Sequence, residues 1–146
     1  MEMGNAIAYE EDFYGWTQQQ AQWLKDREAG QIDWLNLAES IEDMGRSEKR
    51  QLESRLEVLI MHLLKWEFQP NFRSRSWQLT IKEQRLRLEE LLSENPSLRP
   101  KVPDILASIY ALAVISAEKE TGLSDFPETC PYELADILSS SFLPED

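Results

Sequence analysis

The feature that most constrains the fold is a long proline-free stretch, from Asp33 to Gln69, in which apolar residues recur at helical spacing. Apolar residues on both sides of Gly45 fall on one face of a helix: Trp34, Ala38, Ile41, Leu52, Leu56, Leu59 and Leu63. Because this phase is kept across Gly45, we predict one long helix that ends before Pro70. Two helices joined at Gly45 and Arg46 are the alternative.

Capping residues predict two further helices, one on each side of this stretch. Asp12 is a good N-cap for the first, and Gly30 suits the C′ position at its end. After the turn at Pro70, Ser74 or Ser76 can cap a helix over about residues 77–92.

The C-terminal third of the chain predicts a fourth main helix and a short final one. Ser97 can cap the fourth helix, Gly122 suits its C′ position, and Pro103 is expected to delay or bend its start. In the final helix, Cys130 is predicted at the N-cap and Pro131 at the first helical position.

These elements together predict an all-α protein. The segment Ile105–Ala117 is apolar around most of a helix and is expected to be the most buried element. No stretch alternates as a strand does. We therefore predict a single domain over residues 1–146, with an ordered core of about 9–144. Its fold is an antiparallel helical bundle of four main helices, the second one long, plus a short C-terminal helix.

Composition narrows the function classes. The net charge of −12 argues against general affinity for nucleic acids or anionic membranes, and it favours a basic protein partner. The single cysteine, Cys130, cannot form an intrachain disulfide, which suits a reducing cytoplasm. The first residues lack a signal-peptide pattern, and no apolar run is expected to span a bilayer. We predict a cytoplasmic protein with no membrane contact.

The central part of the chain is basic, in contrast to both ends. Residues 46–87 carry ten Lys/Arg and five Asp/Glu, whereas the rest carries five Lys/Arg and twenty-two Asp/Glu. Aromatic and basic residues interleave here, as they do in stacking platforms for single-stranded nucleic acids. The candidate interaction or anion-binding residues are Arg73, Arg75, Lys82, Arg85 and Arg87. The structural alternative is that these side chains pair with acids or cap carbonyl groups of this chain.

Signals for catalysis or metal binding are weak. The chain has no phosphate-binding GxxxxGK[ST] or GxGxxG pattern, and it offers one histidine and one cysteine. A thiol or metal-dependent enzyme would have to use a small set of weak candidates, namely His62, Cys130, Glu39, Glu42 and Asp43. We assign no catalytic, cofactor-binding or metal-binding residue, and we expect no cofactor.

Several segments carry a resemblance to a known family. The strings DFYGWTQQQAQWL, FRSRSWQLTIKEQRLRL and FPETCPYEL occur in the same order and at similar spacing. On these residues, from about Tyr9 to Pro144, the chain resembles the bacterial domain-of-unknown-function family 29, which is abundant in cyanobacteria. The resemblance implies an all-α bundle. It implies no activity, substrate or cofactor, so no catalytic residue can be carried over from it.

The sequence therefore favours a non-enzymatic helical protein that acts by contact with a protein partner, which can include a second copy of itself. The first alternative is an anion-binding or nucleic-acid-binding protein that uses the basic segment Arg73–Arg87, although we do not expect nucleic acid with this net charge. The second alternative is a thiol or metal-dependent enzyme.

Overall fold

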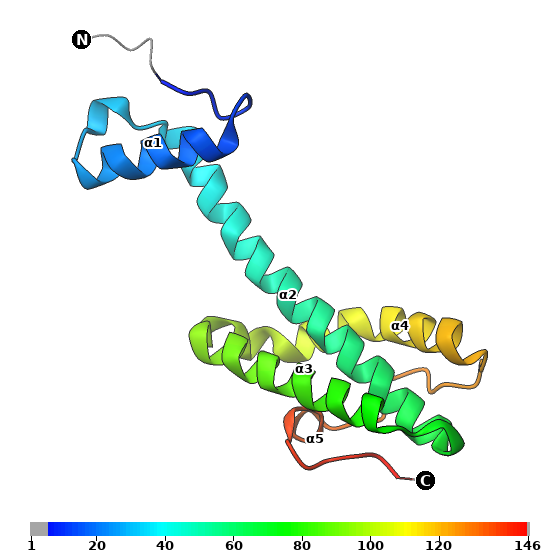
Figure 1. The fold of residues 1–146 in the computed structure, drawn as a ribbon. Helices are drawn as coiled ribbons and strands as arrows, with labels where there is room; N and C mark the ends of the chain where they lie inside the picture. Colours follow the sequence, from blue (N-terminus) through cyan, green and yellow to red (C-terminus); the bar gives the residue numbers. More distant parts are fainter. Residues whose placement is uncertain (1–5, 146) are drawn as a thin grey trace. The chain divides into compact units, whose positions relative to one another are not determined.

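The computed structural model describes residues 6–145, and all regular secondary structure within that range is helical. Five α-helices follow one another along the chain (Figure 1): α1 (Phe13–Lys25), α2 (Trp34–Phe68), α3 (Arg75–Glu94), α4 (Val102–Thr121) and α5 (Leu134–Leu138). Short 3₁₀ segments at Ala29–Gln31, Pro70–Phe72 and Pro96–Lys101 join them. The predicted fold class is confirmed: the chain is all-α, with four main helices, a long second helix and a short C-terminal one.

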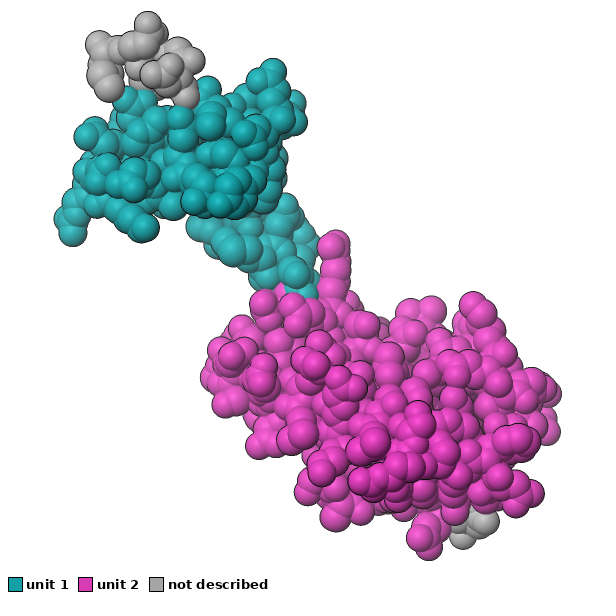
Figure 2. Space-filling model, in the orientation of Figure 1, with its two compact units in different colours: residues 1–47 teal, residues 48–146 magenta. Residues whose placement is uncertain are grey.

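The helices are distributed over two compact units (Figure 2). Unit 1 comprises residues 1–47 and holds α1 and the beginning of α2. Unit 2 comprises residues 48–146 and holds the rest of α2 together with α3, α4 and α5. The single domain over residues 1–146, with an ordered core of about 9–144, stays a prediction.

Helix α2 confirms the prediction of one long helix, which was based on the helical spacing of apolar residues on both sides of Gly45. It runs without interruption through Gly45 and ends at Phe68, two residues before Pro70. Proline has no amide hydrogen and its ring excludes the preceding turn, so the helix cannot continue past this point.

The core of unit 2 is built around the second half of α2. Eight consecutive residues of this helix, from Leu59 to Trp66, are buried. A helix that is buried on all sides must be covered by several neighbours, and here α3, α4 and the C-terminal segment share one apolar cluster with it. The expectation that α4 is the most buried helix is confirmed for whole helices, since seven of its twenty residues are buried, against ten of thirty-five in α2 and five of twenty in α3. Leu112 and Ile115 on α4 are nevertheless about half exposed.

Helix α4 corrects the expectation about membrane spans. The segment Pro96–Thr121 is long and apolar enough, by length and composition, to cross a membrane. Core helices of soluble proteins pass the same test. Seven residues of α4 are buried and belong to the apolar cluster of unit 2, and a third of the apolar window is buried in all.

Two predicted helix ends are wrong. Helix α1 stops at Lys25, because Arg27 takes the left-handed conformation (φ 58°) that we assigned to Gly30. Ser97 lies in the 3₁₀ segment and does not cap α4, which begins at Val102 with Pro103 in its first turn. The predicted delay at Pro103 is confirmed.

The start of the final helix is a third correction. Helix α5 begins at Leu134, so Cys130 and Pro131 precede it and neither has its predicted helical role. Tyr132 explains the difference. Its ring is buried, and its hydroxyl group donates to the Glu67 carboxylate at 2.8 Å, which ties the chain to α2 before a helix can start.

Candidate functional site

The centre of unit 1 is held by one tryptophan and two polar side chains. The indole Nε1 of Trp16 donates to Oδ2 of Asp33 at 3.1 Å, and the backbone N–H of Asp33 donates to Oε1 of Gln20 at 2.8 Å. Trp16 and Gln20 are both buried. Hydrogen bonds from Asn36 and then from Trp16 hold the pKa of Asp33 below its ordinary value. This cluster fixes the end of the α1–α2 connection to α1.

Aromatic rings extend this centre towards the N-terminal side of unit 1. The ring of Tyr9 meets those of Phe13 and Trp16 edge-on, with centroids 5.3 and 4.8 Å away. The rings of Phe13 and Trp16 stack at 5.9 Å. Such pairs stabilise beyond their buried area, yet Phe13 remains 54% exposed.

Unit 1 leaves many apolar side chains uncovered. Among residues 6–145, seven of the thirteen exposed large hydrophobic residues lie in it, although it is the shorter unit. They are Phe13, Tyr14, Leu24, Trp34, Leu35, Ile41 and Met44. Single exposed apolar residues are ordinary, whereas a concentration of them is a feature that interaction surfaces share.

Part of this apolar surface forms a groove between α1 and the first half of α2, which we call the unit-1 groove. It has a volume of about 500 Å³. Apolar side chains dominate its lining and include Tyr9, Phe13, Leu24, Leu37 and Met44. The volume lies within the range of protein sites that take an apolar ligand or an anchoring side chain.

The surroundings of the groove are acidic. Residues 1–47 contain ten Asp/Glu and three Lys/Arg. Asp43, at the edge of the groove, pairs with Arg46 on the exposed side of α2. Glu39 and Glu42, the other two acids of the weak metal candidate, are exposed on the same helix.

The basic candidates of the central segment have different environments. Arg85 is buried, and it donates from Nε to the carbonyl oxygen of Ile137 at 2.8 Å and from Nη2 to that of Asp136 at 3.2 Å. It thereby attaches α3 to α5, and burial lowers its pKa. Arg73 donates to the carbonyl oxygen of Trp66 at 2.7 Å and lies over the Trp66 ring, where it caps α2.

The remaining three basic candidates are exposed on α3. Arg87 pairs with Glu83 on the preceding turn at 3.1 Å. Arg75 and Lys82 line a pocket that also includes Arg85.

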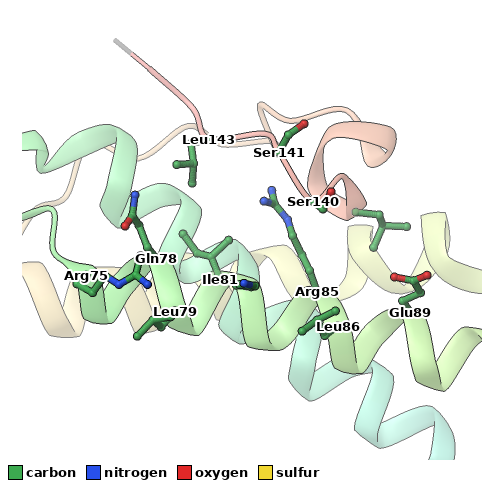
Figure 3. A pocket seen from close by; sticks show the side chains of 12 residues that line it. Arg75, Gln78, Leu79, Ile81, Arg85, Leu86, Glu89, Ser140, Ser141 and Leu143 are labelled. Carbon is green, nitrogen blue, oxygen red and sulfur yellow. The ribbon is translucent and has the colours of Figure 1, made fainter.

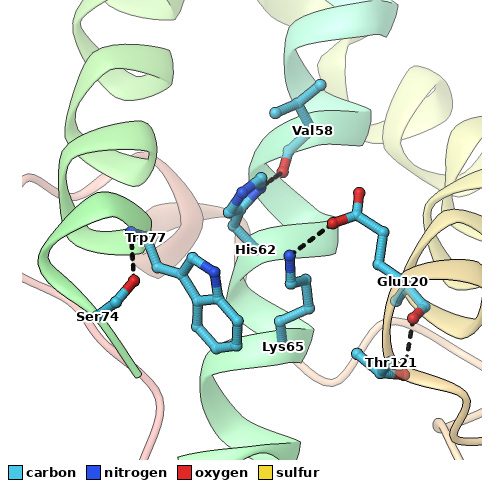
Figure 4. A network of polar contacts seen from close by, with 8 residues as sticks. Val58, His62, Lys65, Ser74, Trp77, Glu120 and Thr121 are labelled. Atoms are coloured by element: carbon cyan, nitrogen blue, oxygen red, sulfur yellow. Dashed lines mark hydrogen bonds and ion pairs between the residues drawn. The ribbon is translucent and has the colours of Figure 1, made fainter. Parts of the chain in front are cut away.

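His62 and Cys130 make separate contacts in the folded chain. His62 is buried in α2, where Nδ1 donates to the carbonyl oxygen of Val58 at 2.9 Å, and burial lowers its pKa (Figure 4). The half-buried thiol of Cys130 lies 3.8 Å from the carbonyl oxygen of Tyr132, and burial raises its pKa. No hydrogen bond joins His62 to Cys130 within residues 6–145.

The neighbours of His62 form a structural network. Nζ of Lys65 donates to Oε1 of Glu120 at 2.7 Å and lies 4.6 Å from the centroid of the Trp77 ring (Figure 4). The network therefore links α2, α3 and α4. Within the described part of the chain, no group of three or more His, Cys, Asp or Glu side chains is arranged to hold a metal ion.

Sequence reasoning did not find the unit-1 groove. Residues that face a core and residues that face a groove are of the same types, so the apolar spacing along α1 does not distinguish the two. The one signal in the sequence is the number of large apolar residues in unit 1, which is larger than the interior of so short a segment can enclose.

The fold and the groove thus define a class, a helical protein with one well-packed unit and one that exposes an apolar groove. The family model described as domain of unknown function DUF29 matches residues 8–143, and the chain belongs to that family. No curated protein and no solved structure matches the chain.

Proposed function

We propose that this protein is a non-enzymatic interaction module and that the unit-1 groove is its contact site. The observation that carries the proposal is the groove itself, an apolar depression between two helices in a unit that leaves seven large apolar side chains of residues 6–47 exposed. When a partner covers apolar surface of this kind, the free energy of the system falls, because the surface is removed from water.

The partner that fits is an amphipathic helix with basic residues beside its apolar face. A groove between two helices suits a third helix that inserts side chains at i, i+3, i+4 and i+7 spacing. The ten acids against three basic residues of unit 1 favour Lys and Arg on the partner's flanks. The same surface of a second copy is equally acidic, so like charges oppose pairing of two unit-1 grooves.

Location is part of the same proposal. We place the protein in the cytoplasm and away from membranes, because its lone cysteine suits a reducing compartment and its acidic charge is repelled by anionic lipid. We do not propose nucleic acid as the partner, since two of the five basic candidates, Arg73 and Arg85, hold backbone carbonyl groups of this chain.

A pair of designed peptides tests the groove. The first is an amphipathic Leu/Lys helix of about 18 residues, and the second has the same pattern with Glu in place of Lys. Fluorescence anisotropy with the full chain at low and moderate salt measures both affinities. We expect the Leu/Lys peptide to bind at least about tenfold more tightly, with an affinity that falls as salt rises.

Matched variants locate the binding. Leu24→Glu with Met44→Glu places two charges in the groove, whereas Leu112→Glu with Ile115→Glu places two charges on the half-exposed face of α4. We expect the first pair to abolish binding of the Leu/Lys peptide and the second pair to leave it within about twofold. Equal losses from both pairs, or no binding by the unaltered chain, would refute the groove as the contact site.

A further inference from the structure

A second depression lies in unit 2, between α3 and the segment that follows α5; we call it the α3 pocket (Figure 3). Its volume is about 350 Å³. Helix α3 supplies Arg75, Lys82 and Arg85, and the C-terminal segment supplies Ser140 and Ser141, the second of which shares a hydrogen bond of 3.2 Å with the Ser139 hydroxyl group. Residues more than fifty positions apart in the sequence therefore line one small cavity.

The pocket has an excess of positive charge. Three cationic side chains line it together with one carboxylate, that of Glu89. Arg75 and Lys82 are exposed, and neither has a hydrogen-bonding or ion-pair partner among residues 6–145. Two unpaired cations beside a partly enclosed cavity provide a favourable environment for an anion.

Arg85 gives the pocket a fixed donor. Its side chain is 7% exposed, and two of its nitrogens are held by the carbonyl oxygens of Ile137 and Asp136. The third nitrogen, Nη1, makes no hydrogen bond within the described range. Figure 3 shows the guanidinium group directed towards the C-terminal segment, close to Ser140 and Ser141. Because its backbone contacts hold it in place, little side-chain freedom remains to be lost on binding.

Apart from the amide of Gln78, the rest of the lining is apolar. Ile81 forms the floor from α3, and Leu138 and Leu143 close the pocket from the C-terminal side. Leu79 and Leu86, both about half exposed, lie at its edge. The pocket therefore offers a cationic and hydroxyl-bearing part next to an apolar part.

From this arrangement we propose that the α3 pocket binds a small organic phosphate, a phosphate monoester dianion that carries an apolar group. The excess of two positive charges matches a dianion. Arginine, lysine and serine are the donors that phosphate oxygens accept from. The cavity has the size of a small-molecule site. A longer nucleic acid fits poorly, because α3 also carries Glu83, Glu90 and Glu94 on its exposed surface.

Titrations of the full chain with four probes test the ligand class. The probes are hexyl phosphate, inorganic phosphate, hexanoate and a short single-stranded oligonucleotide, and chemical shifts of backbone amides report both affinity and location. We expect hexyl phosphate to bind most tightly and to shift amides of α3 and residues 138–143. Inorganic phosphate should bind at the same amides at least about tenfold more weakly, since it lacks the apolar group.

Two pairs of substitutions with the same loss of charge separate the pocket from general electrostatics. Arg75→Gln with Lys82→Gln removes the two exposed cations of the pocket, whereas Arg50→Gln with Arg87→Gln removes two exposed cations outside it. All four positions are exposed, so both variants should fold. We expect the first pair to weaken hexyl phosphate binding by at least about tenfold and the second by less than about twofold.

Three outcomes would overturn the proposal. They are the absence of any shift with hexyl phosphate at low salt, an equal loss of affinity in the two variants, and an oligonucleotide that binds more tightly than hexyl phosphate at the same amides. Arg85 is not a useful test position, because its replacement also releases α5 from α3.

Discussion

The two units of this chain use similar residue types to different ends. In unit 2, one continuous cluster of twenty-one buried residues involves α2, α3, α4 and α5, and no residue of unit 1 belongs to it. In the described part of unit 1, residues 6–47, only Trp16, Gln20 and Ile32 are buried, and most large apolar side chains reach solvent. Apolar content alone therefore does not make a core.

What separates the units is the number of elements that enclose an apolar face. The second half of α2 has neighbours on several sides, whereas the first half shares unit 1 with α1 and one 3₁₀ segment. A short segment buries little apolar surface. The stabilisation from this burial therefore exceeds the conformational entropy lost on folding by only a small margin. Unit 1 should accordingly be the less stable unit, and coverage of its groove should stabilise it.

The largest expected effect is a core truncation in unit 2. Leu56 is completely buried, so Leu56→Ala should lower the free energy of unfolding by about 2–5 kcal/mol. The matched change in unit 1, Leu24→Ala, removes a side chain that is 45% exposed and should cost less than about 1 kcal/mol. Urea unfolding followed by circular dichroism measures both. Equal losses would break the distinction between the units.

The next effect is confined to unit 1. Trp16→Phe removes the indole donor to Asp33 and should cost about 1–3 kcal/mol. We expect faster hydrogen exchange for amides of α1 and unchanged exchange for amides in the second half of α2. A uniform acceleration over the whole chain would mean that the two units unfold together.

Raising the pH above about 10 should lower the stability of unit 2. Burial, followed by the nearby charges of Cys130 and Glu67, raises the pKa of Tyr110 from 10.0 to about 12. Below pH 10 the phenol is protonated in both states. Between about pH 10 and 12 only the unfolded chain loses this proton, so unfolding is favoured and stability falls as pH rises.

Tyr110→Phe is the control for this dependence. The variant loses the hydrogen bond to the carbonyl oxygen of Pro127 and should be less stable at neutral pH. Its urea midpoint should nevertheless fall less between pH 9 and pH 11 than that of the unaltered chain. Parallel slopes would show that Tyr110 ionises equally in both states.

The smallest effect is expected at Ser40. Its hydroxyl oxygen is buried without a hydrogen-bonding partner among residues 6–145, and its side chain lines the unit-1 groove. Ser40→Ala removes this unpaired group and places a better helix former in α2, so it should stabilise unit 1 by about 0.5–1 kcal/mol. Slower hydrogen exchange in α1 and in residues 34–47 would confirm it, whereas faster exchange would mean that the hydroxyl has a partner.

Much of the fold could be predicted because it depends on local signals. The apolar phase across Gly45 specified α2, and the side chains of Asp12 and Ser74 cap α1 and α3 as expected. The errors lie where tertiary contacts decide. Helix α5 begins later than its proline suggests, because Tyr132 is held by α2.

The candidate sites were less predictable. The sequence singled out Arg75, Lys82 and Arg85 as basic residues, but the serines that share their pocket come from the C-terminal segment. The same sequence pattern also included Arg73, whose guanidinium group caps α2. Neither difference can be read from spacing along one chain, since each depends on which segments meet in the folded protein.

Unit 2 should therefore be stable by itself, whereas unit 1, with its exposed apolar groove, should be the less stable unit. Native-state hydrogen exchange of the full chain measures this directly, because it gives an opening free energy for each amide. We predict that amides of α1 and of residues 34–47 open at a free energy well below that of amides from Leu52 to Trp66. The same opening free energy in both sets would contradict the account.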